Sequence, residues 1–459
     1  MAADILWQPP KTGGTAIEKF ADSLVGDGKI DRTDYESIWR WSVADIAEFW
    51  GTWLDYLDLP FDGDPEPVLA SIQMPGAQWF PNLKLNYAEA MLRMPGRSND
   101  DVVVISRSQS RPEVRLTAAE LRDQVARARA GLQRAGVGHG DRVVAYSPNI
   151  PETLVLLLAA ASLGAIFSSC APEFGTQSVI DRWSQIEPTV LLAVAGYQYG
   201  DKAIDRTAEL ATIGAALTSL KTTVVLPYLN SAAELPTGAI SWAAFTAEAA
   251  PLDFDRVDFD TPLYVLFSSG TTGLPKPIVH GHGGITIEHL KALSLQSDLG
   301  PSDRFFWFST TGWMMWNYLV SGIGVGATIV MFDGNPAAPD LGALWRMASE
   351  LEVTYFGTSA PFLLQCRKEG LHPAKIADLT SLKAIGSTGA PLPEAGFRWV
   401  YQEFSPSVQL SSVSGGTDLC AAFVASAPTV PVYAGEIACR ALGADVDAFD
   451  EQGHSVTGA

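Results

Sequence analysis

Cysteine and cationic side chains are scarce in this 459-residue chain. Its four cysteines, Cys170, Cys366, Cys420 and Cys439, lie far apart with no C-x-x-C spacing. This argues against a disulfide framework or a zinc site and favours a reducing cytoplasm. Only 31 Lys and Arg oppose 51 Asp and Glu, and a net charge of −20 repels nucleic acids and anionic membranes. Any anion that binds here must be held by local groups.

Long apolar runs are also missing. The N-terminal residues MAADILWQPP show no basic stretch followed by an apolar core. The most apolar segment, residues 154–167, falls short of the ~20 residues that a membrane-spanning helix needs. Asn149, Pro151 and Gly164 provide start and stop signals, which predict a buried helix instead. We therefore expect no membrane partner.

Short β-branched runs alternate with helix-length segments from residue 101 onward. This alternation predicts an α/β fold, with two βα-type subdomains whose largely parallel sheets are covered by helices. An Ala-, Pro- and Asp-rich stretch near residues 230–260 is the expected boundary. It gives a first subdomain over residues 101–255 and a second over 256–419. Residues 1–100, rich in Trp and Asp, are predicted to form an extension laid over the main body.

The segment YVLFSSGTTGLPKPIVHGHGG, residues 264–284, leads an apolar strand into a loop of hydroxyl residues and glycines with one lysine. A polyphosphate needs many short donors: glycines let backbone N–H groups approach, hydroxyls add donors, and Lys276 adds charge. The loop is not a Walker A loop, because Pro275 and Pro277 replace its Gly and Ser/Thr. Such a composition is usually an unliganded surface loop, but the order of strand, loop, lysine and helix favours a phosphate cradle.

Four further segments follow in order: TTGWMMWNY (310–318), TSAPFLL (358–364), GSTGAPL (386–392) and SVSGGTDL (412–419). Together with residues 264–284 they resemble the signature motifs of the adenylate-forming superfamily, which comprises acyl-CoA synthetases, peptide-synthetase adenylation domains and beetle luciferases. The resemblance implies attack of a substrate carboxylate on the α-phosphorus of ATP, with release of pyrophosphate. Positioning and charge neutralisation would supply most of the catalysis.

The resemblance also implies a role for each matching position. The loop would hold the β- and γ-phosphates, Thr417 would bind the α-phosphate, and Asp418 would coordinate Mg²⁺ through the hard oxygen ligand that this ion prefers. The expected catalytic residues are Thr417, Asp418 and Lys276. The expected ATP-binding residues are Ser268, Ser269, Gly270, Thr271, Thr272, Gly273, Lys276, Gly389, Ala390, Pro391, Ser412, Val413, Ser414, Gly415, Gly416 and Thr417.

Within the superfamily the chain is most similar to the acetyl-CoA synthetase branch, and within it to the acetoacetyl-CoA synthetases, on WFPNLKLNYAE (79–89) and SVSGGTDL. Acetate enzymes carry Trp at the position of Gly415, and losing a side chain that buries ~150–250 Å² makes room for a longer acyl group. Thr388 is expected to donate to a 3-oxo oxygen. The expected acyl pocket comprises Trp313, Met314, Thr388, Gly415 and His280.

Three nearby side chains receive ordinary structural interpretations. Trp316 is expected to pack in a helix. His282 and His289 are expected to be ordinary polar residues, because the spacing from His280 matches no familiar zinc site.

The resemblance therefore implies an ATP-dependent acid:CoA ligase that forms acetoacetyl-AMP and then acetoacetyl-CoA, using ATP, Mg²⁺ and CoA. Three alternatives remain: another short- or medium-chain acyl-CoA synthetase, a carrier-protein-loading adenylation domain, or a catalytically silent nucleotide-binding module. The sequence leaves the oligomeric state open. For the CoA phosphates, only Lys202 and Arg206 offer charge in the stretch GYQYGDKAIDR.

The resemblance implies one more property of the chain. Residues 420–459 should begin a β-rich, distorted-barrel subdomain, and the mobile C-terminal domain of the relatives, with its catalytic lysine, should be absent. The chain alone is therefore expected to be impaired in catalysis.

Overall fold

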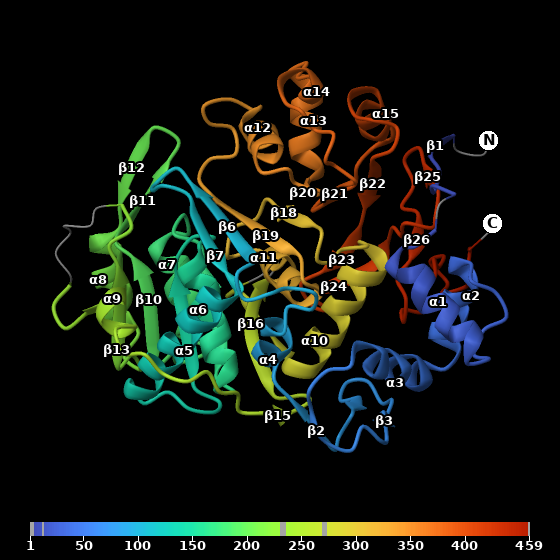
Figure 1. The fold of residues 1–459 in the computed structure, drawn as a ribbon. Helices are drawn as coiled ribbons and strands as arrows, with labels where there is room; N and C mark the ends of the chain where they lie inside the picture. Colours follow the sequence, from blue (N-terminus) through green and yellow to red (C-terminus); the bar gives the residue numbers. More distant parts are fainter. Residues whose placement is uncertain (1–3, 12, 230–235, 269–272, 458–459) are drawn as a thin grey trace.

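The computed structural model describes residues 4–11, 13–229, 236–268 and 273–457, and two seven-stranded sheets form its body (Figure 1). The first sheet has the spatial order β14 (Ile240–Ser241), β13 (Thr222–Leu226), β10 (Val190–Val194), β8 (Arg142–Tyr146), β9 (Ile166–Cys170), β16 (Pro262–Ser268) and β17 (Lys276–Gly281). The second has the order β22 (Gln409–Ser412), β21 (Ala384–Thr388), β20 (Tyr355–Ser359), β18 (Arg304–Trp307), β19 (Thr328–Asp333), β6 (Val102–Ser108) and β7 (Val114–Thr117).

Strand pairing in both sheets is parallel except at one edge, where the hairpins β16–β17 and β6–β7 are antiparallel. Such sheets need helices on their faces, because the strands are buried on both sides. These helices are α5 (Ala118–Arg134), α6 (Pro151–Ser162), α7 (Thr176–Trp183), α8 (Thr207–Ala216), α9 (Trp242–Phe245), α10 (His282–Lys291), α11 (Met314–Ser321), α12 (Ala343–Glu350), α13 (Ala360–Lys368), α14 (Pro373–Ile376) and α15 (Glu394–Glu403). The predicted α/β fold is confirmed.

Helix α6 is the predicted buried helix. It begins with Pro151 at its first turn and ends before Gly164, whose φ is +63°. Its apolar residues from Leu154 to Ala161 are at most 1% exposed. Within the described part of the chain, no helix is both long enough and apolar enough to cross a membrane.

The boundary predicted near residue 255 divides the sequence but not the sheets. Strands β6 and β7, from the predicted first subdomain, lie in the second sheet, where β6 pairs with β19. Strands β16 and β17, from the predicted second subdomain, close the first sheet, where β16 pairs with β9. Local alternation identifies strands but carries no information about distant partners, so the exchange was not foreseeable from the pattern.

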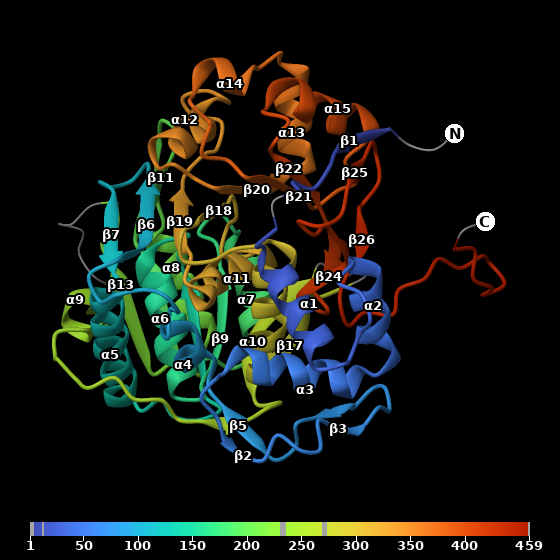
Figure 2. The ribbon, with the colours of Figure 1, turned by 45° about the vertical axis from the view of Figure 1, so that its right-hand side comes forward.

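The N-terminal extension contains α1 (Ala16–Gly26), α2 (Tyr35–Ala44), α3 (Ile46–Leu57) and α4 (Tyr87–Leu92), with short strands β2 (Asp62–Gly63), β3 (Leu69–Ser71), β4 (Gln78–Trp79) and β5 (Leu83–Leu85). Its first strand, β1 (Ile5–Trp7), pairs antiparallel with β25 (Val432–Tyr433), so the first strand of the chain lies beside one of the last (Figure 2). Strand β5 pairs with both β2 and β15 (Val257–Asp258).

The expected β-rich subdomain is represented by short strands. Strands β23 (Ser414–Gly416), β24 (Ala421–Ala425) and β26 (Cys439–Arg440) form a three-stranded sheet beside the second large sheet. A further hairpin, β11 (Gly196–Tyr199) and β12 (Lys202–Asp205), stands apart. None of the sheets described up to residue 457 is a closed barrel.

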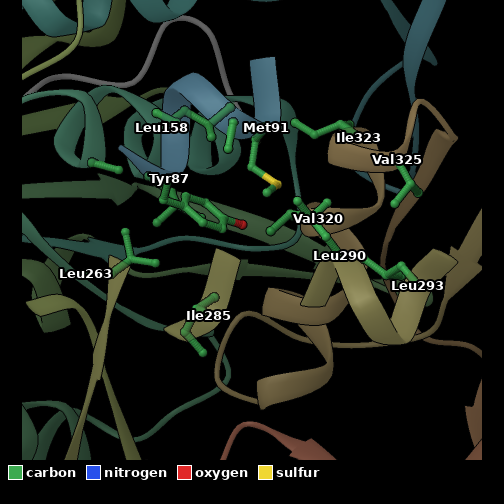
Figure 3. Close-up of a cluster of buried hydrophobic side chains, with 14 of the residues drawn as sticks. Tyr87, Met91, Leu158, Leu263, Ile285, Leu290, Leu293, Val320, Ile323 and Val325 are labelled. Atoms are coloured by element: carbon green, nitrogen blue, oxygen red, sulfur yellow. The ribbon is translucent and has the colours of Figure 1, made fainter. Parts of the chain in front are cut away.

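The extension is part of the core and does not merely cover it. Figure 3 shows Tyr87 and Met91 of α4 packed among Leu158, Ile285 and Leu290 of α6 and α10. Each such side chain contributes ~1.5–3 kcal/mol when fully buried. Between α10 and α11 the helix continues as a π-helical turn, η1 (Ala292–Gln296), and α11 runs into the 3-10 turn η2 (Gly322–Val325). Helix α10 thus packs against both α4 and α11.

Candidate active site

A cavity of about 490 Å³ opens at the carboxyl ends of β18, β21 and β22, under α10 and α11. Ligands of open α/β sheets bind in such crevices. The described wall includes most of the predicted nucleotide and acyl residues: Trp313, Met314, Thr388, Gly389, Ala390, Pro391, Ser412, Val413, Ser414, Gly415, Gly416 and Thr417. Segments that lie about 100 residues apart in the sequence therefore line one space.

Five predicted site residues are not part of that wall: Ser268, Gly273, Lys276, His280 and Asp418. Residues 269–272, the centre of the predicted phosphate loop, lie outside the described residues. The remaining members of the loop lie on the β16–β17 hairpin or on the turn that leads into it.

The hairpin adds a strand between the lysine and the helix expected after the loop. Lys276 begins β17 and pairs with Ser268 across the hairpin, and α10 follows at His282. Alternate strand residues share a face, so Lys276, Ile278 and His280 point to one side. On that side His280 is buried and its Nε2 lies 2.8 Å from the carbonyl oxygen of Thr417. Lys276 lies about 13 Å further along the same face.

His280 is therefore not the acyl-pocket wall that the sequence predicts. Its ring is enclosed by Tyr264, at a centroid distance of 5.8 Å, and by the backbone of Thr417. Burial lowers its pKa below the usual value, so the ring is neutral at pH 7. The sequence places the residue close to the site but cannot tell which neighbour its ring faces.

Thr388 also differs from expectation. Its Oγ1 donates to the carbonyl oxygen of Val413 at 2.9 Å, so its only proton is used within the protein. The predicted hydrogen bond from Thr388 to a 3-oxo oxygen is therefore not available in this arrangement. The hydroxyl of Thr388 instead joins the end of β21 to the loop over 413–417.

Gly415 lines the cavity, but the reason for glycine is more specific than the loss of a capping side chain. A Cβ at this position would lie 2.0 Å from the carbonyl oxygen of Ala421 and 2.8 Å from the Cα of Ala422. The close β23–β24 pairing therefore excludes any side chain unless β24 moves. The small residues Ala421, Ala422 and Ala425 form this part of the wall.

The sequence interpretation missed Trp307. It ends β18, is 1% exposed and lines the cavity. Its ring stacks on Tyr355 and lies over Gly357 and Gly386, where a Cβ would come within 2.1 and 2.7 Å of ring atoms. Its Nε1 has no hydrogen-bond acceptor within the described chain. This nitrogen has less than 1 Å² of accessible surface, so it lies against packed atoms and not on the open face of the cavity.

Polar groups gather around the same end of the cavity. Ser297 Oγ and Tyr318 Oη lie 2.9 Å apart, and Gln296 and His289 line the wall beside them. Gln296 ends the π-helical turn and Ser297 follows it, and such turns often occur at functional sites. No sequence signal indicates this π-helical turn.

The fit to the expected cofactors varies. Asp418 is exposed beside Thr417, and a carboxylate with a neighbouring hydroxyl suits Mg²⁺. His280, His282 and His289 do not meet, and no group of three His, Cys, Asp or Glu in the described ranges could hold a metal. Lys202 is exposed on β12, whereas Arg206 pairs with Glu209 at 3.0 Å. Trp316 packs as expected, with Nε1 donating to Asn149.

Comparison with known proteins defines the class. Residues 93–458 match the family described as AMP-binding enzyme, and residues 35–91 match the acetyl-coenzyme A synthetase N-terminus. The chain belongs to the AMP-binding enzyme family.

The similar proteins narrow the group further. The chain is 42% identical to an acetoacetyl-coenzyme A synthetase of Rhizobium meliloti (strain 1021), over 93% of this chain and 65% of that protein. It is 35% identical to the acetoacetyl-CoA synthetase of Gallus gallus, over 100% and 70%. The solved acetoacetyl-CoA synthetase from Streptomyces lividans superimposes with a TM-score of 0.95 at 44% identity, over 99% and 71%. The chain thus spans about two thirds of the length of these relatives.

A relative named for a different acyl group is almost as similar to the chain as the Gallus gallus protein is. The chain is 34% identical to a malonamoyl-CoA synthetase of Penicillium aethiopicum, over 99% of this chain and 67% of that protein. Identity at this level therefore leaves the acyl group to be decided by the pocket.

Proposed function

We propose that the chain is the nucleotide- and acyl-binding part of an ATP-dependent acid:CoA ligase that activates acetoacetate. The product of the first reaction is acetoacetyl-AMP, with release of pyrophosphate, and the second gives acetoacetyl-CoA and AMP. One observation carries the proposal: a single cavity joins the adenylate-type loops over 389–391 and 412–417 to a polar end lined by Gln296 and Ser297.

The polar end explains the choice of acid. Acetoacetate presents a carbonyl acceptor at C3, which an alkyl acid such as butyrate lacks. The side-chain amide of Gln296, which lines this end, would donate to this oxygen, and butyrate would leave the donor without that partner, at a cost of about 1–3 kcal/mol. Gln296 is 6% exposed, so bulk water does not readily replace the lost partner.

The residues act on the first reaction by holding charge in place. A carboxylate oxygen attacks the α-phosphorus, a new O–P bond forms, and the bond to pyrophosphate breaks. Thr417 would donate to the α-phosphate, and Asp418 would hold Mg²⁺, which neutralises phosphate charge when bound. Lys276 and the hairpin loop would bind the leaving pyrophosphate from the face that His280 shares. The CoA thiol then attacks the acyl carbon and AMP leaves.

The proposal includes a reducing cytoplasm as the place of action. All four cysteines are free, three of them buried. Burial raises the pKa of Cys170 and Cys420 to about 12, so these thiols are unreactive.

The test is calorimetric titration of the 459-residue chain with non-hydrolysable acyl sulfamoyl adenosines. We expect the acetoacetyl analogue to bind more tightly than the butyryl and acetyl analogues. Equal or tighter binding of the butyryl analogue would contradict the acid assignment, and tighter binding of a malonamoyl analogue would reassign it. Product assays use the chain joined to the C-terminal domain of a relative, because the chain alone is expected to be impaired. Product formation with free CoA, against transfer only to a carrier protein, separates the ligase from a carrier-loading domain. Binding without any product in that joined protein identifies a silent module.

A further inference from the structure

Two buried histidines hold the two ends of the segment that carries Thr417 and Asp418. His280 of β17 lies 2.8 Å from the carbonyl oxygen of Thr417 through Nε2, and His289 of α10 lies 3.0 Å from that of Cys420 through Nε2. A carbonyl oxygen only accepts, so both Nε2 atoms carry a hydrogen and donate. His280 is 7% exposed and His289 1% exposed.

The other nitrogen of His289 has a defined partner. Nδ1 lies 2.8 Å from Ser321 Oγ, and Tyr87 Oη lies 2.8 Å from the same oxygen. Burial lowers the pKa of His289 to about 4, so the ring is neutral at pH 7 and its Nδ1 is an acceptor. Only one order then satisfies both ring nitrogens: Tyr87 donates to Ser321, Ser321 to His289, and His289 to Cys420. Ser321 also lies 2.9 Å from the carbonyl oxygen of Asn317, which competes for its proton.

Charged and titratable groups surround the ring. Tyr318 packs edge-on at 5.6 Å, and the Sγ of Cys420 lies 3.8 Å from Nε2 and 3.5 Å from Tyr264 Oη. On α10 itself, Glu288 and Lys291 form an ion pair at 2.7 Å. Lys291 and His280 both disfavour a second proton on His289.

The segment needs such support. Cys420 has φ +51°, in the left-handed region that non-glycine residues avoid. Thr417, Asp418 and Leu419 lie between the two held carbonyls and are part-buried or exposed, so few side-chain contacts fix them. The histidines reach them from β17 and α10, whereas β22, which leads into the segment, belongs to the second sheet.

We propose that His289, together with His280, is a positioning residue that fixes Thr417 and Asp418 against the bound nucleotide. The proposal rests on the function proposed above for these two residues. His289 acts through the backbone of Cys420, although its ring also lines the acyl end of the cavity. An effect on positioning and a direct effect on the acyl group therefore have to be separated.

Calorimetry with AMP alone makes that separation, because AMP has no acyl group. The variant H289L keeps the volume and loses both hydrogen bonds, whereas H289Q keeps a donor and an acceptor. We expect H289L to raise the Kd for AMP and for each acyl analogue by the same factor, about tenfold, and H289Q to stay within about twofold of the parent. Unchanged AMP binding by H289L, or a change confined to the acyl analogues, would overturn the proposal.

A second measurement needs no ligand, so failure of the proposed function does not obscure it. In hydrogen–deuterium exchange, a peptide over residues 414–422 should exchange faster in H289L than in the parent, and H289Q should restore the parental rate. S321A removes the hydroxyl that faces Nδ1 of His289. The same peptide should exchange faster in S321A than in the parent, but less so than in H289L, and S321A replaces H289L if that variant does not fold. H372L is the matched control, since His372 is exposed and bonds Glu403 far from the site. Parental exchange in both H289L and S321A would overturn the proposal.

Discussion

The hydroxyl of Thr388 donates to the carbonyl oxygen of Val413 at 2.9 Å. This bond joins the end of β21 to the loop that continues to Thr417, and both residues line the cavity. The single proton of Thr388 is therefore used within the protein, where it links two segments of the cavity wall.

This relationship predicts the behaviour of two Thr388 variants. T388A removes the bond and should weaken binding of acetoacetyl, butyryl and acetyl sulfamoyl adenosines by a common factor of roughly 3–10. T388S keeps the hydroxyl and should bind as the parent does. The measurement is the ratio of Kd values across the three analogues. A selective loss for the acetoacetyl analogue would instead return Thr388 to the role of 3-oxo donor.

Gln296 predicts the opposite pattern. Q296L keeps a side chain of similar volume and removes the amide donor. Binding of the acetoacetyl analogue should weaken by roughly tenfold, while binding of the butyryl analogue stays constant or improves, because the donor without a partner has gone. Thermal unfolding checks that the fold survives the loss of the amide. Equal loss for both analogues would mean that Gln296 acts through packing alone.

Asp418 predicts a dependence on divalent cation. D418N removes a charged oxygen ligand, so ATP binding should lose most of its enhancement by Mg²⁺, whereas AMP binding in EDTA should be unchanged. Titrations of ATP with and without Mg²⁺ on both proteins provide the comparison. If the variant keeps the full Mg²⁺ enhancement, the cation is held elsewhere.

Local patterns predicted most of the fold, and particular residues show where they stop. The alternation of strands and helices correctly predicted β18 to β22 and the helices between them, because each element carries its own periodicity and caps. The exchange of β6–β7 and β16–β17 between the sheets depends on contacts between distant residues, which local patterns do not contain.

The same division holds at the site. Resemblance placed Gly389 and Thr417 on the cavity wall, but the partners of His280 and Thr388 depend on which way each ring or hydroxyl turns. Trp307 gave no motif signal, because only the folding of the chain brings its ring to the cavity wall. The sequence predicts His289 to be an ordinary polar residue, because local patterns do not reveal its hydrogen-bond partners. These partners are Ser321 and Cys420, 32 and 131 residues away.

The buried histidines predict how stability depends on pH. The pKa of His289 falls from 6.5 to about 4 and that of His282 to about 3, both through burial. Between pH 6.5 and 4 the unfolded chain therefore binds protons that the folded chain does not, so the stability that each neutral ring contributes is lost as pH falls. For His289 the loss reaches about 3 kcal/mol at pH 4. Asp333 acts oppositely, because burial raises its pKa to about 6.

Comparing variants isolates the contribution of one ring. The difference in unfolding free energy between the parent and H289Q should shift against the parent by about 3 kcal/mol between pH 7 and pH 4, since glutamine does not titrate. Urea unfolding at pH 7, 6, 5 and 4 measures this difference. A parent-minus-H289Q difference that stays constant over this range would mean that His289 is protonated as easily in the folded chain as in the unfolded one. The tautomer that connects Tyr87 to Cys420 would then lose its basis.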